Sequence, residues 1–385
     1  MLGLIARRAG HTEPALELFR KAVAVAPRYA EAWVNLGRLL VETGNADDGK
    51  QAFQKALYAR PGYLPAELGQ AQTLKTSGDF AAARSLLESA ADNHPEVSTP
   101  CFDLGNLLQE QGQFQASIDA YTECLVRHPG QNPVLSNRAA AMLKAGQPQS
   151  ALADAEAHLA TGARSANVTA YRVLALQLLG RADEAKAWAN PETMVYPHTP
   201  IAPASFAKAL EADIRAHPTL TEQWDPSRRA ARGGKVTAEL MSHATPAIES
   251  FIRLIRTAVD GLITQLPSET GHPIFDAKPD GYNLTVWANI LAPGGHQASH
   301  IHNLGWLSGV YYPDLPPEID ENGHQGWIAF GEPGYGLPMP DGFQPMFRKP
   351  EAGMMFLFPS YMWHHTVPLE TGAERVSVAF DIVPI

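Results

Sequence analysis

A sequence repeat with a period of 34 residues constrains the fold of this chain more than any other feature. When the first half is aligned with itself at this period, glycines superimpose on glycines and prolines on prolines. The glycines are Gly10, Gly44, Gly78, Gly112, Gly146 and Gly180, and the prolines are Pro27, Pro61, Pro95 and Pro129. A strict period of this length is typical of stacked helical hairpins, because each unit must bury its apolar face against its neighbours.

One unit illustrates the pattern. Its first helix has an apolar face and ends at Gly44, and its second helix stops at Pro61. The residues on the two faces are Trp33, Leu36, Gly37, Leu40, Phe53 and Ala56. Small residues at a helix crossing, with an aromatic side chain beside them, allow the helices to pack closely. This pattern closely resembles the tetratricopeptide repeat family over about residues 1–190, and it predicts an all-α solenoid. The chain begins within the first helix of a unit, which leaves open an array that starts further upstream.

The resemblance implies that a protein or peptide partner binds in the groove of the repeats. The inner helices offer both apolar and polar side chains, namely Val34, Leu68, Phe102, Arg38, Gln72 and Asn106. That mixture suits a partner that presents apolar and amide groups. Alternatively, these residues cover a solenoid that packs against its own second domain, and the sequence leaves both interpretations open.

Charge and cysteine content exclude several classes of protein. The net charge of -10 argues against a nucleic-acid partner, which requires a clustered basic surface. With only two cysteines, a disulfide scaffold is excluded, and a reducing cytoplasm fits. Cys101 and Cys124 both fall at packing positions of the repeats. No segment reaches the run of about 20 apolar residues that a membrane helix needs. We therefore expect a cytoplasmic protein that binds neither nucleic acid nor membrane.

The repeat pattern ends in a proline-rich stretch. We interpret residues 1–190 as the repeat domain, 191–204 as a linker and 205–385 as a second domain. Helical spacing returns at about 205–216 and 247–265. Beyond Pro267 the sequence changes to short apolar runs separated by glycines and prolines, which predicts a β-sandwich or barrel supported by helices.

One predicted strand, at residues 282–291, indicates how a cavity is enclosed. Its even-numbered positions are apolar, whereas Trp287 and Asn289 point to the opposite face. An apolar face against helices and a polar, aromatic face turned inward are what a barrel around a ligand cavity needs.

The candidate chemistry lies in three histidines and one arginine. His300 and His302 are separated by one residue on an extended segment, so their side chains project the same way and can bind one ion. A third histidine, His364, and an arginine, Arg375, follow near the C-terminus. Together they predict a mononuclear metal site with a carboxylate-binding partner.

This order of residues resembles the iron(II)/2-oxoglutarate-dependent oxygenase superfamily. Within it, the segments Trp306–Tyr312 and Phe358–Tyr361 resemble a group of oxygenase domains that are often fused to tetratricopeptide repeats. The resemblance covers about residues 205–385. It implies a double-stranded β-helix, or jelly roll, which uses Fe(II) and 2-oxoglutarate to insert oxygen into a substrate C–H bond.

The resemblance also assigns roles to residues. His300 and His364 match the first and last metal ligands, and His302 stands where most of the superfamily has Asp or Glu. We favour direct binding of the metal by the His302 imidazole. The alternative is that the His302 side chain lies behind the metal ligands, as in the aspartyl/asparaginyl β-hydroxylases. The implied 2-oxoglutarate site consists of Arg375, Ser377, Tyr312 and Asn289. Residues considered for the substrate side or the rim are Trp287, His296 and His365.

Two functions from different classes follow. The first is a dioxygenase that hydroxylates a protein or peptide recruited by the repeats. The second is a tetratricopeptide adaptor whose barrel is catalytically degenerate or binds zinc. A metal enzyme that does not use 2-oxoglutarate is a weaker interpretation, because the Arg375-x-Ser377 motif argues against it.

Overall fold

The computed structural model describes residues 2–8, 11–200, 202–203, 205–222, 230–267, 272, 275–276, 278–319, 323–370 and 372–385. The chain divides into two compact units, Met1–Ala145 and Gly146–Ile385. Each unit is described by itself.

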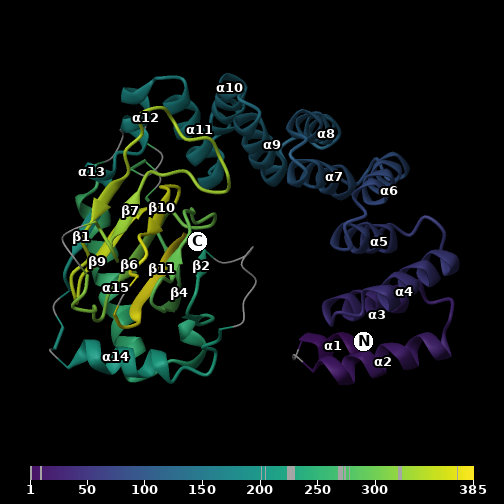
Figure 1. Cartoon of the computed structure of the whole chain (residues 1–385), viewed down its shortest axis with the longest axis horizontal. Helices are drawn as coiled ribbons and strands as arrows, with labels where there is room; N and C mark the ends of the chain where they lie inside the picture. The colour runs from purple at the N-terminus through teal and green to yellow at the C-terminus, as the bar shows by residue number, and fades with distance from the viewer. Residues whose placement is uncertain are drawn as a thin grey trace. The chain divides into compact units, whose positions relative to one another are not determined.

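The first unit consists of helices, as the repeat predicts (Figure 1). The helices are α1 (Leu2–Arg8), α2 (Thr12–Val25), α3 (Ala30–Glu42), α4 (Ala46–Ala59), α5 (Leu64–Thr76), α6 (Phe80–Asn93), α7 (Thr99–Glu110), α8 (Phe114–Arg127) and α9 (Asn132–Lys144). Repeat glycines such as Gly44 and Gly78 have positive φ angles of 84° and 83°, which suit glycine and end the preceding helix. Gly10 lies outside the described residues.

Close helix packing explains the small residue in the first helix of a repeat. A Cβ atom at Gly105 of α7 would lie 2.3 Å from the ring of Tyr121 of α8, so only glycine fits there. The Tyr121 hydroxyl donates to Oδ1 of Asn106 at 2.7 Å, and Ser117 donates to the carbonyl of Gly105 at 2.8 Å. The hairpin is thus held by apolar contact and by satisfied buried polar groups.

The two cysteines form a disulfide across the same hairpin. Cys101 of α7 and Cys124 of α8 are buried at packing positions, as the repeat pattern predicts, and a disulfide joins them. The sequence predicts only a packing role for the two cysteines, and the disulfide is a correction to that prediction. Their separation of 23 residues spans a helical hairpin, so their proximity arises from helix pairing and not from local spacing.

The second unit begins with helices and continues with strands. Its helices are α10 (Pro148–Leu159), α11 (Ala166–Leu178), α12 (Ala182–Trp188), α13 (Pro191–Met194), α14 (Phe206–Arg215), the 3-10 helix η1 (Leu240–His243) and α15 (Pro246–Gln265). Its strands are β1 (Tyr196–His198), β2 (Ala231–Arg232), β3 (Lys235–Val236), β4 (Tyr282–Leu291), β5 (His296–Gln297), β6 (Leu307–Tyr311), β7 (Ile328–Phe330), β8 (Met346–Arg348), β9 (Met355–Pro359), β10 (His364–Thr366) and β11 (Arg375–Pro384).

The strands form a large sheet and two small ones, all antiparallel where they pair. The large sheet has the order β1-β9-β6-β11-β4-β3, and the small sheets are β10-β7-β8 and β2-β5. Strand β11 pairs with β4 over its whole length, with Arg375 opposite Leu291 and Pro384 opposite Tyr282. A helical solenoid followed by antiparallel sheets is the predicted fold class, and the second part is consistent with a jelly roll.

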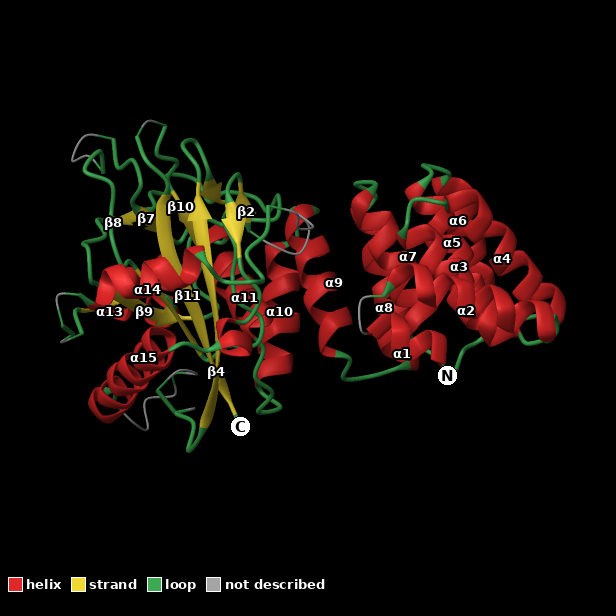
Figure 2. Ribbon diagram, turned by 90° about the horizontal axis from the view of Figure 1, so that it is seen from below, coloured by secondary structure: helices red, strands yellow, loops and turns green. Residues whose placement is uncertain are grey.

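Helices α14 and α15 lie beside the large sheet (Figure 2). Phe251 of α15 lies 5.0 Å from the ring of Tyr311 and 6.4 Å from that of Phe380, measured between ring centroids. Phe206 of α14 contacts Tyr311 as well. Because side chains alternate along a strand, burying Phe380 on this face of β11 turns the odd-numbered residues to the other face.

The last repeat helices contact the turn that follows β9 within the second unit. The Tyr361 hydroxyl donates to the carbonyl of Trp188 at 2.5 Å, and the Arg172 guanidinium stacks 4.1 Å from the Trp188 ring. The compact-unit boundary at 145/146 therefore falls inside the repeat sequence pattern. The predicted limits of 190 and 205 describe that pattern and stay predictions for the functional domains.

Within the described parts of the chain, no helix combines the length and apolar character needed to cross a membrane.

Candidate metal centre

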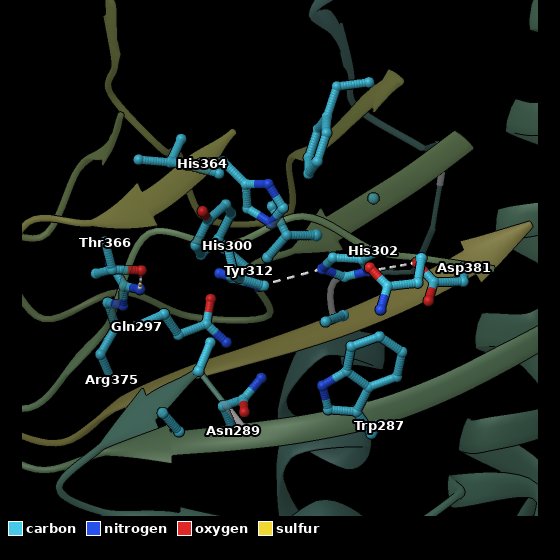
Figure 3. A pocket seen from close by; sticks show the side chains of 18 of the residues that line it. Trp287, Asn289, Gln297, His300, His302, Tyr312, His364, Thr366, Arg375 and Asp381 are labelled. Atoms are coloured by element: carbon cyan, nitrogen blue, oxygen red, sulfur yellow. Dashed lines mark hydrogen bonds and ion pairs between the residues drawn. The ribbon is translucent and has the colours of Figure 1, made fainter. Parts of the chain in front are cut away.

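A cavity of about 300 Å³ lies between the large sheet and the small sheets. The large sheet contributes Trp287, Asn289, Phe358, Arg375 and Asp381, and the small sheets contribute Gln297, Ile328, His364 and Thr366. The lining also includes His300, His302 and Tyr312. Figure 3 shows the imidazoles gathered at one side of the cavity and Arg375 with Thr366 at the other.

The backbone places the three predicted histidines together. His300 and His364 exchange backbone N–H···O=C hydrogen bonds of 3.1 Å across an antiparallel bridge, and His302 donates its N–H to the carbonyl of Ser360. A ligand atom from each of the three side chains lies within 4.8 Å of the others. The i, i+2 spacing and one strand pairing thus form the cluster.

Each imidazole is oriented by a hydrogen bond at Nδ1. Nδ1 of His300 lies 2.8 Å from the carbonyl oxygen of Ala298, and Nδ1 of His364 lies 3.0 Å from that of Met362. Nδ1 of His302 lies 2.5 Å from the carboxylate of Asp381. Because these oxygens only accept, each neutral ring carries its hydrogen on Nδ1 and presents the lone pair of Nε2.

These lone pairs face one another. Nε2 of His302 lies 3.2 Å from Nε2 of His300, a separation that suits two nitrogen atoms sharing one cation. Burial is the main reason that the pKa of His300 falls to about 3, and burial also holds the pKa of His364 well below its usual range. A metal ion is a cation that this arrangement of nitrogen atoms can accept.

The other end of the cavity contains a buried cation. Arg375 donates to the carbonyl of Gly326 and, at 3.0 Å, to the hydroxyl of Thr366, and both of these partners are neutral. Burial lowers the pKa of Arg375. Within the described part of the chain, its Nε has no hydrogen-bond partner. A buried guanidinium with a spare donor is suited to an anionic ligand.

Two neighbours extend this polar end. The amide nitrogen Nδ2 of Asn289 is also buried without a partner among the described residues. The ring of Tyr312 lies 5.6 Å from the Arg375 guanidinium carbon, and burial raises the pKa of its hydroxyl to about 12. At neutral pH Tyr312 therefore stays protonated. Arg375, Asn289 and Tyr312 together offer donors and no negative charge.

The remaining predicted residues occupy different places. Trp287 lines the cavity, with its ring centroid 5.5 Å from that of His302. Ser377 is buried opposite Asn289 in the strand register, but it is not among the described residues that line the cavity. His296 and His365 lie outside this lining too, and Nε2 of His365 is 3.7 Å from the Glu332 carboxylate.

Three further lining residues were not predicted from the sequence, namely Gln297, Thr366 and Asp381. Strand alternation could have found Asp381, because it lies six residues after Arg375 on the last strand and therefore on the same face. Thr366 had a weaker signal, since it is two residues after His364 on a short strand. No local feature of the sequence marks Gln297.

A second cavity lies in the repeat unit and is lined mainly by polar residues. Its volume is about 350 Å³, and α5, α6 and α7 supply Leu68, Ala71, Gln72, Lys75, Leu87, Asp103, Asn106, Gln109 and Glu110. Leu68, Gln72 and Asn106 were expected in the groove, whereas Val34 is buried in the core. Burial raises the pKa of Asp103 from 3.8 to about 6, against the opposing effect of Lys75.

Replacing Asp103 with asparagine is expected to stabilise the repeat unit at neutral pH. A carboxyl group whose pKa is raised on folding lowers stability as pH rises from 3.8 towards 6, because the unfolded chain releases the proton first. The gain at pH 7 should be about 1–2 kcal/mol, allowing for partial solvent exposure. It should shrink by more than half at pH 4.5.

Calorimetric unfolding of the full chain at the two pH values measures this difference. Asp119→Asn, at an exposed position of α8, is the matched control and should change stability little at either pH. An equal gain at both pH values would show that the Asp103 carboxylate is not the cause.

Comparison with known families gives two kinds of match. Residues 285–381 match the family described as "Putative 2OG-Fe(II) oxygenase". Residues 1–63, 68–132 and 102–166 match one tetratricopeptide repeat model, and residues 166–191 match a second. No curated protein matches the chain.

Solved structures that are similar to this chain include the following three. PilF of Pseudomonas aeruginosa is 19% identical, over 48% of this chain and 85% of its own, with a TM-score of 0.41. PilW, a type IV pilus biogenesis factor, is 18% identical over 48% and 86%, also with a TM-score of 0.41. YrrB, described as a TPR protein with an unusual peptide-binding site, is 16% identical over 44% and 88%, with a TM-score of 0.36.

Likenesses of this size carry no argument about function. The family matches, however, agree with the repeats and with the strand-rich region that contains the histidine cluster. The chain therefore carries tetratricopeptide repeats within residues 1–191 and, at residues 285–381, a domain that matches the 2OG-Fe(II) oxygenase family described as putative.

Proposed function

We propose that this protein is a 2-oxoglutarate- and Fe(II)-dependent dioxygenase that hydroxylates a protein or peptide recruited by its repeats. The observation that carries the proposal is the pairing, in one cavity, of three convergent imidazole Nε2 atoms with a buried arginine that lacks a counter-charge among the described residues. A metal with open coordination positions and an anionic co-substrate would complete such a cavity.

The donor set fits iron(II). Neutral imidazole is a common ligand for this metal, and the three Nδ1 hydrogen bonds already orient the rings. His300, His302 and His364 would therefore hold the ion. The position of His302 favours direct ligation over a place behind the ligands, because its Nε2 faces Nε2 of His300.

The polar end fits 2-oxoglutarate. The spare donors of Arg375 and Asn289 are suited to a carboxylate, and hydrogen bonds to a charged acceptor are roughly twice as strong as neutral ones. Thr366 and Tyr312 border the same place. Ser377 stays a prediction for this site, as an additional hydroxyl donor to 2-oxoglutarate. The cavity of about 300 Å³ is at the small end for ligand sites, so a small acid and one substrate side chain suit it.

The mechanism divides the cavity between two tasks. When bound, iron(II) with O₂ supplies the oxidation that converts a C–H bond to C–OH while 2-oxoglutarate becomes succinate and CO₂. Arg375 binds the carboxylate farther from the metal and thereby orients the co-substrate. Tyr312, Ile328 and Phe358 border the cavity and limit the entry of water. Trp287, beside His302, borders the space left for substrate.

The repeats would supply the macromolecular partner. The cavity around Gln72, Asp103 and Asn106 offers amide and carboxylate groups, which suit the backbone and the basic side chains of an extended peptide. Recruitment by a separate unit explains why a small catalytic cavity can act on a large partner.

Anaerobic titration of the full chain with Fe(II) and 2-oxoglutarate tests the proposal. We expect a weak visible charge-transfer band with one equivalent of each, followed by succinate formation when O₂ is admitted. No band and no succinate would overturn the proposal.

Metal analysis after expression separates the alternative function. A three-histidine site also suits zinc, so tight stoichiometric zinc without succinate formation would support an adaptor with a zinc-binding barrel.

A further inference from the structure

We infer that Asp381 is a positioning residue that supplies the metal centre, through His302, with the negative charge that the usual His-x-Asp/Glu motif places directly on the ion. The inference rests on the proposed function and deepens it, because it assigns a role to a residue far from that motif. Asp381 follows His302 by 79 positions and belongs to the last strand.

Strand geometry places Asp381 at the cavity. It lies on β11 six residues after Arg375, so both side chains belong to the face that lines the cavity. In the register Asp381 is opposite Thr285 of β4 and Ser308 of β6. Pairing on both sides therefore fixes its position.

The hydrogen bonds of Asp381 are those of a residue that orients a metal-binding side chain. Oδ1 accepts from Nδ1 of His302 at 2.5 Å and from the hydroxyl of Ser308 at 2.6 Å. The side chains of His302 and Asp381 are 8% and 14% exposed, so water screens this pair weakly. A carboxylate here can only accept, which keeps the hydrogen of His302 on Nδ1 and its Nε2 free for a metal.

Charge gives the carboxylate a second effect. With three neutral imidazole ligands, a divalent ion and its protein ligands keep a net charge of two units. With two histidines and one carboxylate, that net charge is one unit. An anion hydrogen-bonded to the far nitrogen of a ligating imidazole makes that ring a stronger donor and delivers part of this charge. In this protein the carboxylate of Asp381 thus lies behind the His302 imidazole and does not occupy the ligand position itself.

The other two histidines of the cluster do not have a carboxylate at Nδ1. Nδ1 of His300 and of His364 face backbone carbonyls, which are neutral. Of the three clustered histidines, only His302 has a described carboxylate hydrogen-bonded to its Nδ1. His302 also occupies the position where most of the superfamily has an acidic ligand.

Titration of the full-length apoprotein with Co(II), under non-turnover conditions, tests the inference. Asp381→Asn keeps an oxygen that can accept from His302 but removes the charge. We expect about 10- to 100-fold weaker Co(II) binding and a shifted visible spectrum. Apoprotein thermal unfolding should change little, because the hydrogen-bonded geometry can persist. Asp381→Glu, which restores the charge, should recover part of the affinity.

Ser308→Ala is the matched control. It removes one hydrogen bond to Asp381 and leaves both the carboxylate and its contact with His302, so Co(II) affinity should fall less than in Asp381→Asn. Histidine ¹⁵N NMR of the wild type should show Nδ1–H at His302, and a hydrogen on Nε2 instead would contradict the assigned orientation.

The outcomes separate this inference from the proposed function. If the wild type binds Co(II) and Asp381→Asn binds it with equal affinity and an unchanged spectrum, the inference is overturned and the proposed function stands. If the wild type binds neither Co(II) nor Fe(II), the proposed function fails first.

Discussion

Replacing His364 with alanine is expected to abolish stoichiometric binding of Fe(II) and, with it, the conversion of 2-oxoglutarate to succinate. His364 contributes one of three convergent Nε2 atoms, and removing it leaves two imidazoles that face each other at 3.2 Å. Loss of a direct ligand should exceed the 10- to 100-fold effect known for groups behind a ligand, so we expect affinity to fall by more than about 100-fold. Equilibrium dialysis with metal analysis measures the loss.

The neighbouring histidine provides the control. His365→Ala changes the same residue type one position away, but His365 is directed to Glu332 and lies outside the cavity lining. Metal affinity should stay within a few-fold of the wild type. Equal losses from both substitutions would mean that the effect is not specific to the His364 imidazole, and the assignment of His364 as a ligand would be wrong.

Replacing Arg375 with glutamine should separate the two halves of the site. Glutamine can still donate to Gly326 or Thr366 but cannot balance a carboxylate, so Fe(II) should bind normally while 2-oxoglutarate binds weakly. Truncating one partner of a buried, hydrogen-bonded charge pair costs about 2–5 kcal/mol, or roughly 30- to 4,000-fold in affinity. Calorimetric titration of 2-oxoglutarate into the anaerobic Fe(II) protein measures the change.

Arg256→Gln is the corresponding control. This arginine is exposed on α15 and stacks on Tyr282, away from the cavity lining, and its replacement should leave 2-oxoglutarate binding unchanged. If Arg375→Gln retained wild-type affinity, the buried guanidinium would not be the co-substrate site, even with an intact metal centre.

Much of the fold could be predicted because its signals are local and periodic. The 34-residue repeat specifies helix pairs, since each unit contains its own apolar faces and its own terminating glycine. Alternation in residues 282–291 likewise identified the inward positions of Trp287 and Asn289 before any pairing was known. These inferences need only the neighbours of a residue along the chain.

Predictions that depend on contacts between distant segments were less complete. The disulfide between Cys101 and Cys124 follows from helix pairing within a repeat. The hydrogen bond from the Tyr361 hydroxyl to the carbonyl of Trp188 joins the strand-rich region to a repeat helix. Neither contact has a local signature. The compact unit that begins at Gly146 therefore differs from the limits suggested by the repeat pattern.

At the candidate metal centre, the sequence alone determined the residue types and their order: a His-x-His pair, a distal histidine and a strand arginine. The tertiary structure decided which atoms face one another. Sheet register sets Asp381 behind His302, and the backbone bridge between His300 and His364 directs the imidazoles to one point. The physical reason is that spacing along a strand fixes the face on which a side chain lies, whereas the partner across the cavity depends on how separate strands pair.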